Sequence, residues 1–267
     1  MNAPKKSLGQ HFLINTKALT MVAESLMIRD GDTVIEIGPG HGELTDLLAA
    51  SPAAKIIAIE KDHELANALR AKYDPPAGGR NSKIEIVEGD ALKDLARVAE
   101  RIGSPYVLAG NIPYYITGHL LRIAGELQNK PIRTVLTMQK EVALRICAIP
   151  PRMNRLAACV QAWGTPRTLT TLAPTDFDPA PTVDSAIIAI ETKAGDSAEA
   201  LPENYYEIVR IVFQQPRKTI LNNLASGLSL GKETALDLLK KAGLSGTERP
   251  ENLSIATIRE IARLSTH

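Results

Sequence analysis

The sequence predicts an α/β protein with a mostly parallel sheet, followed by a small all-helical C-terminal domain. Three observations predict this class. Short runs rich in Val and Ile alternate with segments of helical periodicity, as in parallel sheets covered by helices on both faces. A glycine-rich loop, EIGPGHGELT, follows the first of these runs. After residue 204 the pattern is only helical.

The predicted strands are short β-branched runs, several of which end in a small, polar or acidic residue. In chain order they are Thr33–Gly38, Lys55–Glu60, Lys83–Asp90, Tyr106–Asn111, Arg133–Gln139 and Asp184–Thr192. Helical stretches such as GELTDLLAAS, DHELANALRAKY and GHLLRIAGELQN lie between them. The segment LAACVQAWGTPRTLTTL is also interpreted as a strand. It would pair with Asp184–Thr192 as an antiparallel hairpin at the edge of the sheet.

Residues 193–204, KAGDSAEALPEN, are small, polar and acidic, which is typical of a linker. We therefore predict two domains, residues 1–195 and residues 196–267. The helical runs of the second domain are YYEIVRIVFQQPRKTILNNLASGL, KETALDLLKKAGL and SIATIREIARL. Ser254 is expected to cap the last helix, and Gly243 to follow the end of the one before it.

Composition excludes several classes of protein. No run approaches the roughly 18 consecutive apolar residues of a membrane helix, and the N-terminus lacks the apolar core of a signal peptide. The two cysteines, Cys147 and Cys159, form neither a disulfide framework nor a metal site in this pattern. We therefore expect a cytoplasmic protein with no metal and no membrane partner. The net charge of +1 does not by itself suggest a nucleic-acid partner.

The glycine loop and two acidic residues predict an adenosine-binding pocket. Gly38 and Gly40 let the backbone turn tightly against a ligand, but their G-x-G-x-G spacing does not suit a pyrophosphate, and no P-loop lysine follows. Glu60 ends the second strand, where an acid can accept from both ribose hydroxyls. Asp90 ends the third strand, where a carboxylate could accept from the adenine amine. The alternative is that these residues serve only to turn the chain and cap strand ends.

The stretch GNIPYYIT follows the fourth predicted strand and opens at the same edge of the sheet. The Asn111 amide oxygen and a backbone carbonyl near Ile112 could accept from a ring amine and leave its lone pair more localised on nitrogen. Pro113 fixes the backbone that presents this carbonyl. Tyr114 offers a ring on which a base can stack. The alternative is a β-turn with two buried aromatic rings.

In these motifs the chain resembles a known family, the S-adenosylmethionine-dependent ribosomal-RNA adenine dimethyltransferases of the KsgA type. The similarity runs almost end to end, through KKSLGQHFL, VIEIGPGHGELT, EGDAL, GNIPYYIT, MQKEVALRI, FDPAPTVDSA, RKTILNNL and ERPENLS. The resemblance implies a class I methyltransferase fold, Rossmann-like, with a mostly parallel seven-stranded sheet, and a small helical C-terminal domain that binds RNA.

The resemblance also assigns residues. It implies S-adenosyl-L-methionine contacts at His11, Leu13, Gly38, Gly40, Glu60, Asp90 and Asn111, and catalytic roles for Asn111, Pro113, Tyr114 and Phe177. Phe177, in FDPAP, would hold a flipped adenine against Tyr114. Tyr115 stands where many relatives have Asn, and packing is its expected role. Pro216 stands at a position that is often basic, on a helix expected to face RNA.

The function implied is transfer of two methyl groups to the exocyclic amine of each target adenosine in small-subunit ribosomal RNA. The expected partner is this RNA within a pre-subunit particle, bound by a monomer. The candidate RNA-binding residues are Lys5, Lys6, Lys140, Arg145, Arg152, Arg155, Arg217, Lys218, Lys240 and Lys241.

Three other functions share part of this pattern. A large-subunit, macrolide-resistance rRNA methylase shares the glycine loop and the N-I-P-Y tetrapeptide, but RKTILNNL and ERPENLS resemble the small-subunit type. A non-catalytic ribosome-assembly factor would be expected to lack Glu60, Asp90 or Asn111, and all three are present. A dinucleotide oxidoreductase is disfavoured by the glycine spacing.

Overall fold

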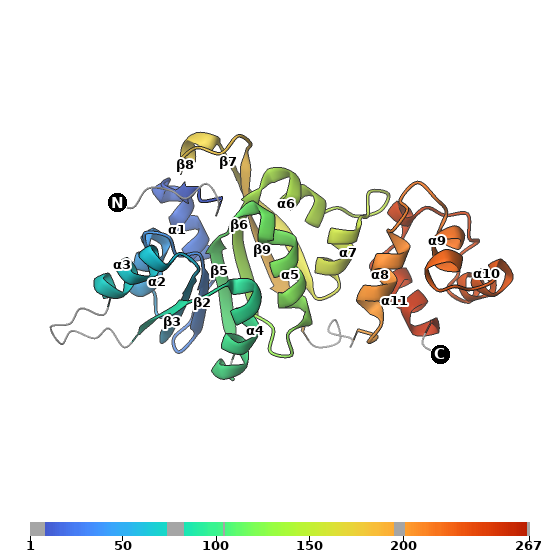
Figure 1. Ribbon diagram of the computed structural model, residues 1–267, viewed down its shortest axis with the longest axis horizontal. Helices are drawn as coiled ribbons and strands as arrows, with labels where there is room; N and C mark the ends of the chain where they lie inside the picture. Colours follow the sequence, from blue (N-terminus) through green and yellow to red (C-terminus); the bar gives the residue numbers. More distant parts are fainter. Residues whose placement is uncertain (1–8, 74–82, 104, 195–200, 266–267) are drawn as a thin grey trace. The chain divides into compact units, whose positions relative to one another are not determined.

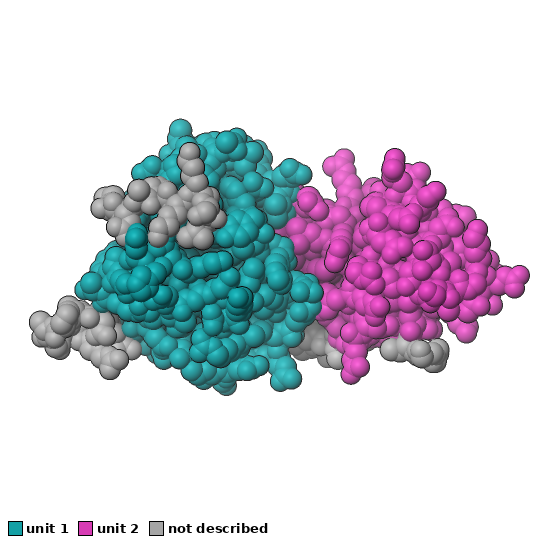
Figure 2. All heavy atoms as spheres, in the orientation of Figure 1, with its two compact units in different colours: residues 1–143, 165–192 teal, residues 144–164, 193–267 magenta. Residues whose placement is uncertain are grey.

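The computed structural model describes residues 9–73, 83–103, 105–194 and 201–265. The chain divides into two compact units, which are coloured separately in Figure 2. Unit 1 contains residues 1–143 and 165–192, and unit 2 contains residues 144–164 and 193–267.

Unit 1 is built on a seven-stranded sheet with the strand order β4-β3-β2-β5-β6-β9-β7 (Figure 1). The strands are β2 (Thr33–Ile37), β3 (Lys55–Glu60), β4 (Ile84–Glu88), β5 (Tyr106–Asn111), β6 (Arg133–Gln139), β7 (Gly164–Leu172) and β9 (Ser185–Thr192). Neighbouring strands from β4 to β6 pair in parallel, whereas β6 and β9 pair antiparallel. The predicted fold class, a mostly parallel seven-stranded sheet closed by an antiparallel strand, is confirmed.

Helices cover both faces of this sheet (Figure 1). They are α1 (Thr16–Ser25), α2 (Glu43–Ala50), α3 (His63–Tyr73), α4 (Ala91–Ile102) and α5 (Thr117–Glu126). The helix that follows β6, α6 (Lys140–Ile146), spans the boundary between the two units. Helices α1, α2 and α3 pack with alternate strand residues such as Val34, Ile56 and Val107 in one core cluster. Because side chains alternate along a strand, the intervening Ile35 and Ile57, also buried, face the opposite side. Burial on both faces explains why these strands are apolar runs rather than alternating patterns.

A second, two-stranded sheet joins the ends of unit 1. β1 (Phe12–Leu13) pairs antiparallel with β8 (Phe177–Asp178), so that Leu13 lies opposite Phe177. Unit 1 also contains two short 3-10 turns: η2 (Tyr114–Ile116) lies between β5 and α5, and η3 (Pro174–Asp176) lies directly before β8. We call residues 9–13 the strap. β1 and β8 were not among the predicted strands, because two-residue strands carry no periodic pattern.

Unit 2 is helical. Its helices are α7 (Arg155–Gln161), α8 (Tyr205–Val212), α9 (Ile220–Gly227), α10 (Lys232–Lys241) and α11 (Ile255–Leu264), with a 3-10 turn, η5, at Pro250–Asn252. The expected cap is present: the Ser254 hydroxyl accepts from the Thr257 N–H at 3.1 Å. Gly243 follows α10 with a positive φ of 78°, also as expected.

Two predictions about this region were wrong. LAACVQ forms helix α7 rather than part of a strand, with Asn154 as its N-cap, accepting from Ala157 N–H at 3.1 Å. A short apolar run does not distinguish a buried helix from a strand. Because Ala157 and Ala158 pack with Tyr205 in one cluster, residues 144–164 belong to unit 2 rather than to the predicted first domain. The predicted boundary at 195/196 lies outside the described residues.

The predicted helix over YYEIVRIVFQQPRKTILNNLASGL is interrupted. α8 ends at Val212 and α9 begins at Ile220, so Pro216, Arg217 and Lys218 lie in the exposed connection. The residue before a proline avoids the helical conformation, which accounts for the break.

Candidate functional site

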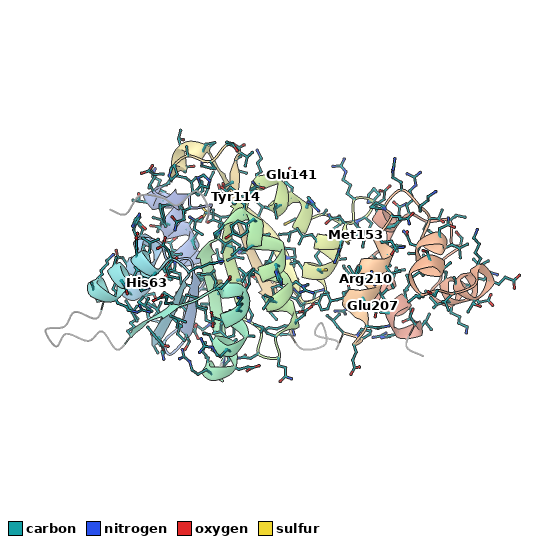
Figure 3. The ribbon with its side chains drawn as sticks, in the orientation of Figure 1. His63, Tyr114, Glu141, Met153, Glu207 and Arg210 are labelled. Carbon is teal, nitrogen blue, oxygen red and sulfur yellow. The ribbon has the colours of Figure 1, made fainter. Side chains whose placement is uncertain are left out.

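A cleft of about 1010 Å³, part of it open to solvent, lies in unit 1 at the carboxyl ends of the central strands. This is where open α/β sheets bind ligands. The predicted residues that line it are His11, Leu13, Gly38, Gly40, Glu60, Asp90, Asn111, Pro113 and Tyr114. We call the part formed by Gly38, Gly40, Glu60 and Asp90 the acidic half, and the part formed by Asn111, Pro113 and Tyr114 the amide half. Tyr114 is labelled in Figure 3.

The glycine loop of the acidic half requires glycine for two reasons. Gly38 and Gly40 have φ values of 66° and 61°, in the left-handed region that L side chains avoid. A Cβ on Gly40 would also lie 2.8 Å from Cδ1 of Phe12 in the strap. The strap therefore closes directly onto the glycine loop. Sequence reasoning assigned no role to Phe12, although it lies within GQHFL.

Glu60 presents a fixed carboxylate in the acidic half. Its side chain is 6% exposed, and it accepts from Gly40 N–H at 3.2 Å and from Asp62 N–H at 2.8 Å. Burial raises the pKa of Glu60, although these backbone N–H groups oppose the rise. A buried carboxylate held by backbone donors is oriented to accept further hydrogen bonds, as the two hydroxyls of a ribose would supply.

Asp90 is the N-cap of α4, where its carboxylate accepts from Leu92 N–H at 3.0 Å. The Lys61 ammonium donates to the same carboxylate at 2.9 Å. Partial burial favours the neutral acid, but these donors outweigh it, and the pKa of Asp90 is lowered. Asp90 therefore stays an acceptor in the cleft. Lys61, which also lines the cleft, was missed because nothing in its sequence context distinguishes it.

Glu36 is a second buried carboxyl in this half of the cleft. It is 1% exposed and accepts from the Thr45 hydroxyl at 2.7 Å. Burial, together with the nearby Glu60, raises the pKa of Glu36 from 4.5 to about 8. Its carboxyl is therefore mostly neutral at pH 7.

In the amide half, the strap orients Asn111. The Asn111 side-chain N–H donates to the His11 carbonyl at 2.7 Å, across 100 residues of sequence. Asn111 Oδ1 therefore remains available as an acceptor. The His11 ring is itself held by the Pro179 carbonyl, which lies 2.7 Å from its Nδ1. Leu13, at the end of the strap, is 3% exposed and packs into the core.

Two contacts hold the Tyr114 side chain, one at its hydroxyl and one at its ring face. Its hydroxyl lies 2.6 Å from the Ser185 hydroxyl, and its ring is nearly parallel to that of His11, with 5.9 Å between the ring centroids. Burial raises the pKa of Tyr114, so the phenol stays neutral. An aromatic ring of fixed orientation next to the Asn111 amide suits a planar ligand.

Two aromatic residues lie elsewhere than predicted. Phe177 does not line the cleft: it is 3% exposed and packs in the core cluster, opposite Leu13 in the small sheet. Tyr115 was expected to pack, but it is 61% exposed and lines the cleft. The pairing of β1 with β8, which the sequence does not reveal, determines the position of Phe177.

The candidate RNA-binding residues are scattered over both units. Lys5 and Lys6 lie outside the described residues. Lys140 is paired with Asp184 at 3.2 Å. The exposed residues with no ion pair to any other described residue are Arg145, Arg152, Arg155, Arg217, Lys218, Lys240 and Lys241.

The part of the chain that the structure describes shows no feature of a metal site or of a membrane span. No group of three or more His, Cys, Asp or Glu side chains there could hold a metal ion. None of the helices in the same ranges combines the length and apolarity needed to cross a membrane.

Comparison with known proteins places the chain among rRNA-modifying enzymes. The sequence model of the family described as ribosomal RNA adenine dimethylase matches residues 1–266. Two relatives are named ribosomal RNA small subunit methyltransferase A. That of Dehalococcoides mccartyi is 37% identical and covers 94% of this chain and 84% of the relative. That of Pelotomaculum thermopropionicum is 38% identical and covers 97% and 90%.

Two solved structures are similar over nearly the whole chain. A dimethyladenosine transferase from Plasmodium falciparum is 26% identical, with a TM-score of 0.75, covering 94% of this chain and 96% of the other. The 23S rRNA methyltransferase ErmE is also 26% identical, with a TM-score of 0.71, covering 95% and 98%.

Proposed function

The chain belongs to the ribosomal RNA adenine dimethylase family, and we propose that its cleft transfers two methyl groups in succession to the exocyclic amine of adenosines in small-subunit ribosomal RNA. The observation that carries this proposal is the orientation of Asn111. Its amide N–H is held by the His11 carbonyl, so its oxygen is directed to other donors in the cleft.

The acidic half fits S-adenosyl-L-methionine. Glu60 would accept from the ribose hydroxyls and Asp90 from the adenine amine, while Gly38 and Gly40 leave space for the ligand beside the backbone. His11 and Leu13 would contact it from the strap. When bound, S-adenosyl-L-methionine supplies an electrophilic methyl group on a sulfonium sulfur.

The amide half would prepare the substrate amine. The lone pair of an adenine amine is delocalised into the ring, so the amine is a weak nucleophile. Acceptance of its N–H groups by Asn111 Oδ1 and by a carbonyl near Ile112 favours a pyramidal nitrogen with a more available lone pair. Pro113, with φ of −55°, holds the backbone that presents this carbonyl. The methylated amine is cationic and loses its proton to water, so these residues act by positioning and polarisation.

Tyr114 would stack on the target base, which must leave its helix for its amine to be reached. One face of Tyr114 is next to His11, so the base uses the opposite face or displaces His11. Phe177 can supply a second stacking face only if its ring leaves the core, and its role stays a prediction. After the first methyl transfer one N–H remains, so the second transfer requires the amine to rotate or the base to re-enter.

The relatives favour the small subunit as the source of the RNA. Identity to the two small-subunit methyltransferases is 37% and 38%, against 26% to the 23S rRNA methyltransferase ErmE. We propose that the chain acts as a monomer in the cytoplasm, on RNA within a pre-subunit particle.

The test is to incubate the protein with labelled S-adenosyl-L-methionine and either small-subunit particles or large-subunit RNA, and to analyse the nucleosides. Dimethyladenosine is expected only from the small subunit. Dimethyladenosine from large-subunit RNA alone would assign the chain to the resistance methylases. Absence of methylation of any RNA, with cofactor binding intact, would favour a non-catalytic assembly factor.

A further inference from the structure

Tyr115 is an exposed aromatic residue at the cleft, and the mechanism above does not use it. Its side chain is 61% exposed, in a chain that is only 4% aromatic. Tyr114, directly before it, is turned inward and bonded to Ser185. The two consecutive tyrosines therefore present to the cleft one ring that is bonded to Ser185 and one ring that is exposed.

The backbone on either side of Tyr115 is held by hydrogen bonds. It lies within η2, where Ile116 N–H donates to the Pro113 carbonyl at 3.2 Å and Thr117 N–H donates to the Tyr114 carbonyl. A Cβ on Gly9 of the strap would lie 3.6 Å from Cδ1 and Cε1 of the Tyr115 ring. The strap therefore lies close to the Tyr115 ring, and the backbone that carries the ring is fixed by the hydrogen bonds of η2.

A cationic side chain lines the same cleft as this ring. Lys61 and Tyr115 line the same cleft, and the Lys61 side chain is 50% exposed although its ammonium donates to Asp90 at 2.9 Å. An exposed aromatic ring and an ammonium group in one cleft can together bind a single nucleotide, with its base stacked on the ring and its phosphate near the charge.

We propose that Tyr115 and Lys61 form a subsite for the nucleotide adjacent to the target adenosine. This proposal rests on the proposed function, because a base that is flipped into the amide half leaves its neighbour at the mouth of the cleft. Contacts to such flanking nucleotides set substrate choice in enzymes that flip bases. Tyr115 would then affect the affinity for RNA and the preference for the nucleotide next to the target, and not the methyl transfer itself.

The test measures RNA binding by fluorescence anisotropy, with an RNA hairpin that carries the target adenosine. Tyr115→Ala should weaken binding by about 5- to 100-fold, the range expected for loss of one base–aromatic stack. Tyr115→Phe, which keeps the ring, should bind within about 3-fold of wild type. Ile132→Ala is the control. Ile132 is 44% exposed but directly precedes β6, at the amino end of that strand, whereas the cleft lies at the carboxyl ends of the strands.

A hairpin with an abasic site next to the target adenosine, on one side or the other, separates stacking from a structural role. On one of these RNAs, wild type and Tyr115→Ala should bind equally, because the stacking partner is already absent. A Tyr115→Ala effect that persists on both abasic RNAs would overturn the proposal. So would an equal loss of S-adenosyl-L-methionine affinity, which would place Tyr115 in the cofactor site.

The charge is tested separately. The affinity of Lys61→Gln for RNA should fall less steeply with salt than that of wild type. The slope of log affinity against log salt should be smaller in magnitude by about 1, the amount expected for one phosphate contact. An unchanged slope would contradict the assignment of Lys61. If wild type methylates RNA and Tyr115→Ala binds it normally, only this subsite fails. If wild type methylates no RNA, the proposed function itself fails.

Discussion

In the acidic half of the cleft, Glu60 and Asp90 are held by residues at most 29 positions away, whereas in the amide half Asn111 and Tyr114 are held by residues 100 and 71 positions away. Glu60 accepts from Asp62 N–H and Asp90 accepts from Leu92 N–H, each two residues away. Asn111 is oriented by His11, 100 residues away, and His11 by Pro179, 168 residues away.

This difference has a physical consequence. The turns and caps of the acidic half form with the strands and helices that carry them. The amide half takes its geometry only after the strap and the segment around Pro179 have closed on it, at an entropic cost that grows with the length of the loop. The acidic half should therefore respond to local changes of charge and backbone, and the amide half to loss of a single contact.

The largest expected effect is in the amide half. Asn111→Ala removes the acceptor for the substrate amine, and turnover should fall by about 10²-fold or more, the scale of losing one polarising contact. Affinity for S-adenosyl-L-methionine should stay within about tenfold, since Glu60 and Asp90 are intact. Single-turnover kinetics and calorimetry measure the two quantities. Asn67→Ala, at an exposed amide on α3, is the control. Unchanged turnover would contradict the mechanism.

The burial of the acidic half predicts a pH effect on stability. The pKa of Glu36 is raised to about 8, so its contribution to stability is present below its unfolded value of 4.5 and is lost as the pH rises through 8. Glu36→Gln keeps the size and the bond from Thr45 but cannot ionise. Between pH 5 and pH 8, wild type should lose on the order of 3 kcal/mol of unfolding free energy relative to the variant, at ~1.4 kcal/mol per pKa unit. Urea titrations at both pH values measure this. Parallel pH profiles would show that Glu36 is not desolvated.

Cofactor affinity should depend on the charge of Glu60. Glu60→Gln removes the charge and turns one ribose acceptor into a donor. Because hydrogen bonds to charged groups contribute about 1.5–3 kcal/mol, the dissociation constant for S-adenosyl-L-methionine should rise roughly 10- to 100-fold. RNA affinity should not change, because Glu60 lies in the acidic half. A parallel loss of RNA affinity would show that the two halves are coupled.

The smallest effect concerns the contact between the strap and the acidic half, at Phe12 and Gly40. Gly40→Ala introduces strain from φ of 61° and a contact with Phe12, whereas Gly103→Ala has the same strain, with φ of 62°, but nothing within 4 Å of its Cβ. Both should lose about 1 kcal/mol from the backbone conformation. Gly40→Ala should lose more, and also cofactor affinity, as Phe12 moves. Thermal denaturation of the pair measures the difference. Equal losses of stability would show that Phe12 moves aside without any further loss of stability.

Much of the fold followed from local pattern. Strands such as Lys55–Glu60 and Arg133–Gln139 have the predicted bounds, because β-branched runs bounded by turn residues define strands locally. The family predicted from the motifs is confirmed by the match over residues 1–266. The errors at LAACVQ and around Pro216 arose where a pattern was short or a proline was given too little weight.

The candidate site divides in the same way. The positions of Gly38, Gly40, Glu60 and Asp90 at one edge of the sheet could be predicted, because parallel strands carry their carboxyl ends to the same edge. The sequence by itself therefore determined the class of fold, the family and these four residues of the cleft.

The tertiary structure alone decided how the side chains of the amide half are directed. It placed Phe177 in the core, turned Tyr114 inward to Ser185 and Tyr115 outward, and gave Asn111 its orientation through His11. Each of these depends on contacts between segments far apart in the chain, and such contacts leave no periodic or spacing signal in any one segment. Closure of the strap on the cleft, rather than the motif GNIPYYIT alone, distinguishes the two tyrosines.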